Sequence, residues 1–353
     1  MIIHNKFPGG NVIVKEQTDS HVYIENELRD TTQDWFYWAF CVEGAEGKTV
    51  TFHFQKYRVG YFGPAVSHDL DSWHWLDSID DEYTFTYHFG ENEDKVYFAH
   101  HMLYNMKRFD ALVERAGFKV EELCKGHKAE KGRSVPCLRF GEGDRYMLLT
   151  ARHHACESTG SYVLEGLLEE LAKEPLEGIS VFCVPFVDYD GVLDGDQGKG
   201  RNGRDHNGQY APCDIPAYPE SVAISEFIED HNVVYGFDFH SPAHSGGKND
   251  LPFLVHNSIR KRDRLLRFSE CLQKEITPGS LQYRAENDIA PLEEWNMIPN
   301  RGIAYNTMHR PGADIAVSLE TTYAGLPENK VDQEKLVELG RCFARAIRRY
   351  IGG

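Results

Sequence analysis

The sequence lacks the features that mark several large classes of protein. No stretch of its 353 residues approaches the 18 or more apolar residues of a membrane-spanning helix, and its start, MIIHNKFPGGNVIV, lacks the basic-then-apolar plan of a signal peptide. Basic residues are few, since 38 Lys and Arg stand against 55 Asp and Glu, a formal net charge of −17. Nucleic acids and anionic membranes bind basic surfaces, so neither is expected as a partner. We expect a soluble cytoplasmic protein.

Paired cysteines are also missing. The eight cysteines are scattered along a long chain, with no CxxC pair and no closely spaced framework. We therefore expect reduced thiols. A structural zinc site built from cysteines is excluded for the same reason, because its ligands would come in pairs two to four residues apart.

Two patterns of hydrophobic residues divide the chain. From about residue 10 to residue 100, short runs rich in aromatic and β-branched residues alternate with Gly, Asp and Asn clusters, which predicts a small antiparallel β domain at residues 1–104. A connecting helix is predicted at 105–117. The remainder, residues 118–353, is predicted to be a single α/β domain.

Strand and helix patterns alternate through this second domain. A chain of this kind folds as a sheet flanked by helices. The predicted strands are 146–150, 179–187, 233–239 and 315–319, and the predicted helices are 161–171, 221–229, 262–272 and 332–350.

Polar residues follow three of these predicted strands. His154 and Glu157 lie three residues apart just after the first, while His240 and Glu320 end two others. Ligands of open α/β sheets bind beyond the carboxyl ends of the strands. A hydrolytic zinc site needs three nitrogen or oxygen ligands and one open position for water, which two histidines and one glutamate can supply. His153 is a local rival for His154, and Glu320 is left free to act as a base.

The sequence resembles the M14 metallocarboxypeptidases. Within that family it resembles the cytosolic-carboxypeptidase-like branch, which carries an amino-terminal β-sandwich. ARHHACES at 151–158 resembles the family's zinc motif, FDFHS at 237–241 the segment with the third ligand, and SLETTYAG at 318–325 the segment with the catalytic Glu. WFYW at 35–38 and VYFA at 96–99 are similar to stretches of the sandwich domain.

The resemblance implies a carboxypeptidase-like mixed sheet flanked by helices, preceded by the sandwich. It also implies one Zn²⁺ per chain. It selects His154 over His153 as a ligand, together with Glu157 and His240, and makes Glu320 the general base.

The stretch DGVLDGDQGKGRNGRDHNG at 190–208 resembles the family's substrate loop. There the family uses one Arg to polarise the scissile carbonyl and an Asn-Arg pair to bind the substrate's terminal carboxylate. The resemblance suggests Arg201 for the first role and Asn207 for half of the second, with Arg204 as a rival for either. Gly208 stands where the carboxylate-binding Arg is expected. Tyr305 is a further candidate for the substrate pocket.

Three functions are compatible with these residues. The first is a zinc hydrolase that cuts an amide bond at or near the C-terminus of a peptide. The second is a zinc-dependent amidase or deacylase whose substrates lack a free carboxylate, suggested by Gly208. The third is a non-catalytic binding protein, which would have no physical need to retain the presumed ligands together with Glu320.

Overall fold

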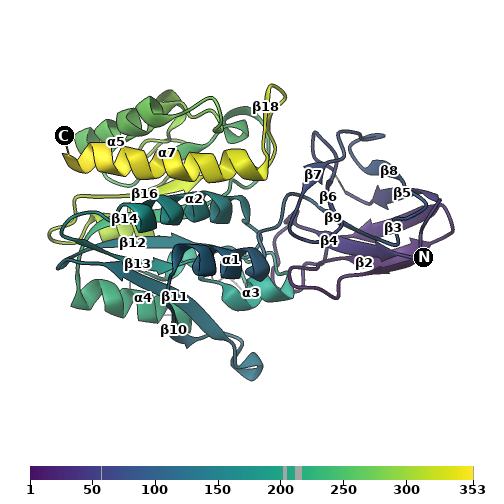
Figure 1. Ribbon diagram of the computed structural model, residues 1–353, viewed down its shortest axis with the longest axis horizontal. Helices are drawn as coiled ribbons and strands as arrows, with labels where there is room; N and C mark the ends of the chain where they lie inside the picture. The colour runs from purple at the N-terminus through teal and green to yellow at the C-terminus, as the bar shows by residue number, and fades with distance from the viewer. Residues whose placement is uncertain (57, 202–204, 211–216, 353) are drawn as a thin grey trace.

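The computed structural model describes residues 1–56, 58–201, 205–210 and 217–352. A smaller β lobe and a larger lobe of strands and helices lie side by side (Figure 1). The cysteines among the described residues are free thiols. No helix in these ranges is both long and apolar enough to cross a bilayer.

The smaller lobe consists of two stacked sheets. One has the order β1-β4-β9-β6-β7 and the other β2-β3-β5-β8. Their bounds are β1 Ile2–His4, β2 Ile13–Gln17, β3 His21–Glu25, β4 Ala39–Glu43, β5 Thr49–Phe54, β6 Ala65–Ser67, β7 His74–Trp75, β8 Thr84–His88 and β9 Lys95–Ala99.

Alternating side chains hold the two sheets together. In β5 every second residue is buried, so Phe52 faces the other sheet, where its ring centre lies 5.3 Å from that of Phe40 and 5.4 Å from that of Phe98. The pairing is antiparallel except between β3 and β5, which run parallel. The predicted sandwich therefore forms, with one parallel pair that the sequence pattern did not reveal.

Helix α1 (Met106–Ala116) connects the lobes. Asn105 caps its first turn by accepting a hydrogen bond from the Arg108 backbone N–H, and Gly117 ends it with φ 70°. The helix buries Phe109 and Leu112 in the core of the larger lobe.

The larger lobe is built on a mixed seven-stranded sheet of order β10-β11-β13-β12-β14-β16-β15. The four strands from β13 to β16 in this order are parallel, while β10, β11 and β15 run antiparallel to their neighbours. Their bounds are β10 Val120–Lys125, β11 Ser134–Gly141, β12 Arg145–Ala151, β13 Ile179–Val184, β14 Asn232–His240, β15 Phe253–His256 and β16 Ile315–Glu320. The prediction of a mixed α/β sheet is confirmed.

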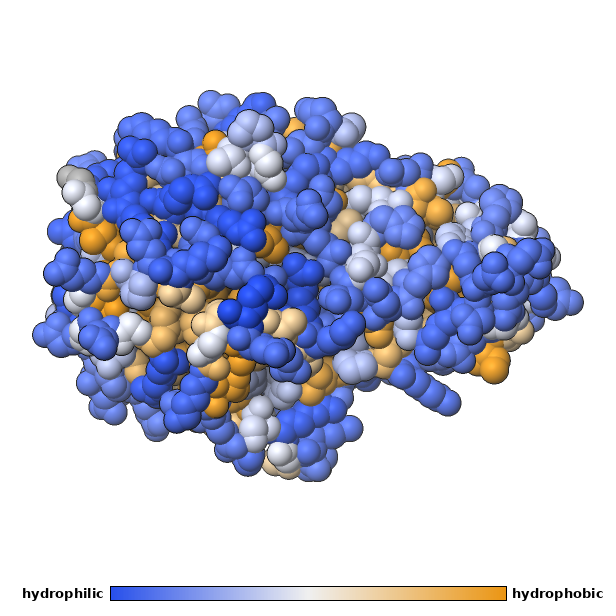
Figure 2. All heavy atoms as spheres, in the orientation of Figure 1, coloured by the Kyte–Doolittle hydropathy of each residue, from blue (hydrophilic) through white to orange (hydrophobic). Residues whose placement is uncertain are grey.

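Helices cover both faces of this sheet (Figure 1). One face carries α1, α2 (Thr159–Lys173), α5 (Arg262–Glu275) and α7 (Gln333–Gly352), and the other carries α4 (Pro219–Asp230) and α6 (Ile303–Met308). The short α3 (Tyr189–Asp194) lies beside the β lobe, and β17 (Gly325–Leu326) pairs with β18 (Asn329–Lys330). Hydrophilic side chains cover α5 and α7 on the outside (Figure 2).

Two glycines allow α2 and α7 to pack closely. A Cβ on Gly166 would lie 1.9 Å from the Val337 carbonyl oxygen, and a Cβ on Gly340 would lie 1.9 Å from that of Val163. A side chain at either position would force the two helices apart.

The order of the parallel strands determines where a ligand can bind. From β12 the chain passes first to β13 on one side and later to β14 on the other. The connections therefore diverge next to β12, and a crevice forms beyond the carboxyl ends of β12 and β14, the usual ligand site of such sheets.

Candidate active site

A cleft of about 840 Å³ opens at this point. Among its lining residues are six that the sequence predicts: His154, Glu157, Asn207, His240, Tyr305 and Glu320. Three different strand ends thus deliver side chains to one cavity, as the sequence predicts.

A strained turn presents the first two of them. After β12, Arg152 adopts φ 60°, a left-handed conformation that is rare outside glycine. Its buried guanidinium donates to the Ala155 carbonyl oxygen at 2.9 Å and so closes the turn on itself. Helix α2 begins directly afterwards, which leaves His154 and Glu157 facing the cleft.

Three buried side chains converge here. Nδ1 of His154 lies 2.8 Å from Oε1 of Glu157, and Nδ1 of His240 lies 2.8 Å from Oε2 of the same carboxylate. One nitrogen or oxygen from each residue lies within 4.8 Å of the others. This is the composition of a catalytic zinc site, with two imidazoles and one carboxylate.

Outer carboxylates fix which nitrogen of each histidine faces inwards. Nε2 of His154 lies 3.0 Å from Asp205, and Nε2 of His240 lies 2.7 Å from Asp238. An ionised carboxylate can only accept, so each ring donates from Nε2 to its outer carboxylate and turns Nδ1 toward Glu157. Once a metal ion displaces the Nδ1 protons, two imidazole nitrogens and one carboxylate can bind it together, so the residues present fit a metal ion.

His153, the rival ligand, has both ring nitrogens engaged. Nδ1 lies 2.9 Å from Asp238, and Nε2 lies 2.7 Å from the Tyr210 hydroxyl. The ring is buried and supports the same Asp238 that orients His240. The structure therefore favours His154, the choice implied by the family motif.

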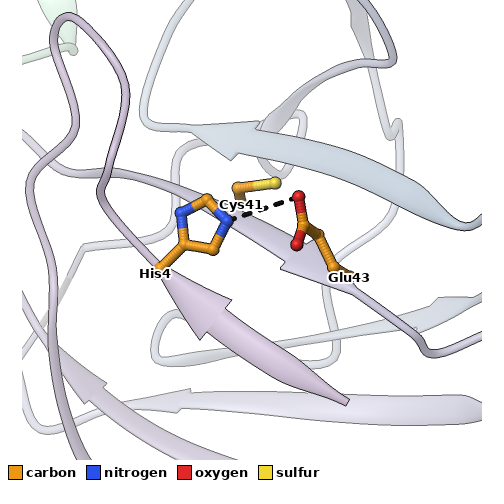
Figure 3. A group of neighbouring side chains, drawn as sticks. All are labelled: His4, Cys41 and Glu43. Carbon is orange, nitrogen blue, oxygen red and sulfur yellow. Dashed lines mark ion pairs between the residues drawn. The ribbon is translucent and has the colours of Figure 1, made fainter.

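Another group of potential ligands lies on the β lobe. His4, Cys41 and Glu43 project from paired strands β1 and β4 toward one another (Figure 3). The Lys95 ammonium lies 3.0 Å from Glu43 and already neutralises that carboxylate, while burial raises the pKa of the Cys41 thiol to about 12. A neutral thiol and a nearby cation both disfavour a dication, so this group is the weaker metal site.

The electrostatics of the convergent trio favour a charged carboxylate. Burial alone would raise the pKa of Glu157, but the neighbouring charges of His154 and His240 outweigh it and hold that pKa well below its usual range. Burial would likewise lower the pKa of His240, yet Asp238 and Glu157 raise it well above the ordinary value. The carboxylates around this pocket therefore stabilise positive charge inside it.

Glu320 lies beside these groups but is not locked into them. It is opposite His240 in the register of β14 and β16, and it is buried. Its Oε2 has no hydrogen-bond partner among the described residues. Burial raises the pKa of Glu320 to about 7, within the range suited to a general base near neutral pH.

The predicted substrate residues fall in different places. Asn207 and Tyr305 line the cleft, and Asn207 Oδ1 accepts a hydrogen bond of 3.0 Å from the Ile303 backbone N–H. Gly208 also lines the cleft. Arg204 lies outside the described residues.

Arg201 is separated from the cleft by its own ion pairs. It is buried, it does not line the cleft, and its guanidinium contacts Asp30, Asp188 and Asp196. A guanidinium held by three carboxylates is poorly placed to reach a substrate carbonyl. The role suggested for it by the family resemblance stays a prediction, and the geometry favours another cation.

Three residues that lie near His154, Glu157 and His240 were not predicted from the sequence. Asp238 stands two residues before His240 in a strand, so both side chains lie on one face, and this spacing is a usable signal. Asp205 and Lys199 lie in an irregular loop, where spacing gives no comparable signal.

Comparison with known proteins agrees with this geometry. Residues 3–101 match the family model of the cytosolic carboxypeptidase N-terminal domain. The structure of a metallo-carboxypeptidase from Pseudomonas aeruginosa superimposes with a TM-score of 0.80 over 100% of this chain and 99% of that one, at 20% identity. The chain has the metallocarboxypeptidase fold.

Sequence relatives of this metallocarboxypeptidase-like chain are distant. An uncharacterised protein of Zymomonas mobilis is 26% identical over 313 residues, covering 81% of this chain and 80% of that protein. Cytosolic carboxypeptidase 2 of Macaca fascicularis is 27% identical over 205 residues, which is 50% of this chain but only 24% of that protein. The resemblance predicted from the motifs is confirmed in the fold of the chain and in the family model matched by its N-terminal domain.

The outer carboxylate gives a first prediction. Asp238→Asn should weaken zinc binding by about 10- to 100-fold, because an amide no longer holds His240 in the required tautomer. Titration of the metal-free protein with zinc would measure this, and the exposed Asp263→Asn serves as the matched control. An affinity equal to that of the control would show that Asp238 does not orient a ligand.

Proposed function

We propose that this chain is a zinc-dependent hydrolase that cleaves an amide bond at or near the C-terminus of a peptide. The observation that carries the proposal is the arrangement around Glu157, where two histidines held by outer carboxylates turn their Nδ1 atoms inwards. His154, Glu157 and His240 would hold one zinc ion.

Glu320 would move the protons. Zinc bound here would polarise the scissile carbonyl and acidify the attacking water. Glu320 accepts a proton from that water as its oxygen bonds to the carbonyl carbon, and the carbonyl π pair moves onto the carbonyl oxygen. When the C–N bond breaks, Glu320 returns the proton to the leaving nitrogen, so that an acid and an amine are released.

The cleft offers a cation for the substrate's terminal carboxylate. Arg301 lines it, and its backbone carbonyl oxygen accepts a hydrogen bond of 3.1 Å from the Tyr210 N–H. Ile303, two residues further on, is bonded to Asn207. Arg301 and Asn207 are therefore neighbours in the wall of one cavity, and Arg301 is our candidate for the Arg missing at Gly208. Arg204 remains the alternative.

A peptide panel tests this assignment. Wild type should hydrolyse peptides with free C-termini faster than their amidated forms, and Arg301→Gln should raise KM for free peptides by about tenfold or more, since a charge-assisted hydrogen bond contributes about 1.5–3 kcal/mol. Arg204→Ala is compared in parallel. Equal rates on free and amidated peptides would reject the carboxypeptidase assignment.

That outcome would favour the second candidate, an amidase or deacylase. The observation that supports it is Gly208, which has no side chain to bind a carboxylate. A non-catalytic binding role has less support, because it does not explain a buried Glu320 without a partner for Oε2 among the described residues.

The net charge of −17 supports a protein that does not bind nucleic acid or anionic membranes. Together with the similarity to cytosolic carboxypeptidases, it leads us to propose a cytoplasmic location.

A further inference from the structure

The loop of residues 196–201 packs directly on the turn that carries His154 and Glu157. Gly198 has φ 75°, and a Cβ there would lie 2.1 Å from the Ala155 backbone nitrogen. The Cys156 N–H also donates to the Gln197 carbonyl oxygen at 3.4 Å. Only glycine permits this approach, which brings the next residue, Lys199, to the cleft.

Lys199 places its ammonium beside the presumed metal ligands. Its Nζ lies 3.2 Å from both ring nitrogens of His154 and 3.8 Å from Oε1 of Glu157, and its side chain is 20% exposed. No other carboxylate in the described residues pairs with it. Unlike Arg201, it lines the cleft and is not enclosed by carboxylates.

The β lobe holds this loop from the other side. The Asp30 carboxylate accepts hydrogen bonds from the Gln197 N–H at 3.0 Å and from the Gly198 N–H at 2.8 Å. The Gln197 side chain bonds to the backbone of Tyr37 at 2.9 and 2.8 Å. These contacts join the loop to the domain at residues 3–101, through residues that lie at least 160 positions earlier in the chain.

An aromatic ring of the same domain supports the ammonium itself. Lys199 Nζ lies 5.1 Å from the centre of the Trp35 ring, within the range of a cation–π interaction. Trp35 is fixed in turn, because its Nε1–H donates to the Cys156 Sγ at 3.3 Å. The face of Trp35 therefore positions Lys199 without neutralising its charge.

We propose that Lys199 is a catalytic residue that stabilises the negative charge developing on the scissile carbonyl oxygen, and that Asp30 and Trp35 of the N-terminal domain position it. The inference rests on the proposed hydrolytic function and assigns to Lys199 the role that the family resemblance suggests for Arg201. It also gives the sandwich domain a part in catalysis, since the loop and the cation are held from that side.

The main test uses the zinc-loaded protein and two variants. Lys199→Met should lower kcat on the fastest peptide of the panel by about 10²–10³-fold, the usual effect of removing one oxyanion donor, with little change in KM and unchanged zinc content. Lys199→Arg should recover much of the loss. A Lys199→Met variant with zinc bound and kcat within threefold of wild type would overturn the proposal.

A second readout does not depend on turnover. A phosphonate isostere of the same peptide carries the charge of the tetrahedral state, and its affinity is measured by calorimetry. Lys199→Met should weaken this affinity by a factor similar to the loss in kcat, whereas Lys248→Met, a lysine of the same cleft paired with Glu294 at 2.7 Å, should have a far smaller effect. Equal effects of the two variants would refute a special role for Lys199.

The positioning role is tested by a double-mutant cycle. Asp30→Asn should weaken phosphonate binding in wild type but have almost no further effect in Lys199→Met, because both act through one cation. Fully additive effects would show that Asp30 supports the fold and not Lys199. If the wild-type protein neither binds zinc nor cleaves any peptide, the proposed function itself is wrong. If Lys199→Met binds zinc and stays active, only the role proposed for Lys199 is wrong.

Discussion

His240→Ala is expected to lose most of its bound zinc and all measurable peptide hydrolysis. The imidazole supplies one of three ligand atoms, and among the described residues no other side chain forms such a group with His154 and Glu157. The change also leaves Asp238 and Glu157 without their shared partner, and breaking a buried pair of this kind costs about 3–5 kcal/mol of stability. Circular dichroism must therefore confirm that the variant is folded.

Elemental analysis of the purified variant measures this loss. His4→Ala is the matched control, because it removes a histidine from the group in Figure 3 and leaves the cleft intact. It should keep both zinc and activity. Full zinc occupancy in His240→Ala, or loss of zinc in His4→Ala, would mean that the cleft residues are not the ligands.

Glu320→Gln should keep zinc and lose about 10²–10⁴ in kcat, the usual effect of removing a general base. The amide has nearly the same shape as the carboxylate but cannot accept the water's proton. Kinetics and zinc content are measured together, with the exposed Glu328→Gln as the control. Activity within a few-fold of this control would place the base elsewhere.

The same substitution should not destabilise the metal-free protein. Burial raises the pKa of Glu320 to about 7, above its ordinary 4.5, so the folded state holds a proton that the unfolded state releases. This contribution to stability is present below pH 4.5 and is lost as the pH rises through 7. At pH 8 the metal-free Glu320→Gln should therefore melt at or above the Tm of wild type.

Much of the fold follows from local pattern. The strand predicted at 146–150 is β12 at 145–151, and the helix predicted at 262–272 is α5 at 262–275. β12 is a continuous run that is buried on both faces, and α5 has helical periodicity because it buries one face against the core. The antiparallel strands β10, β11 and β15 were not predicted; β15 has only four residues, and charged residues interrupt the apolar residues of β10.

Only the site residues at the carboxyl ends of the predicted strands could be located from the sequence. His154, Glu157, His240 and Glu320 follow buried strands, and the fold brings them to one cleft. The predicted substrate loop is not attached directly to a buried strand in this way, and the positions of Gly198 and Arg201 depend on contacts with distant residues. Asp30 accepts a hydrogen bond from the Gly198 N–H and pairs with Arg201, and no local pattern connects positions so far apart in the sequence.

The location of the zinc ion can be measured by X-ray diffraction from crystals of the zinc-loaded protein, recorded above and below the zinc absorption edge. We expect one anomalous peak per chain, within about 2.0–2.2 Å of Nδ1 of His154, Nδ1 of His240 and a carboxylate oxygen of Glu157. A peak on His4, Cys41 and Glu43 alone, or none in the cleft at saturating zinc, would contradict it.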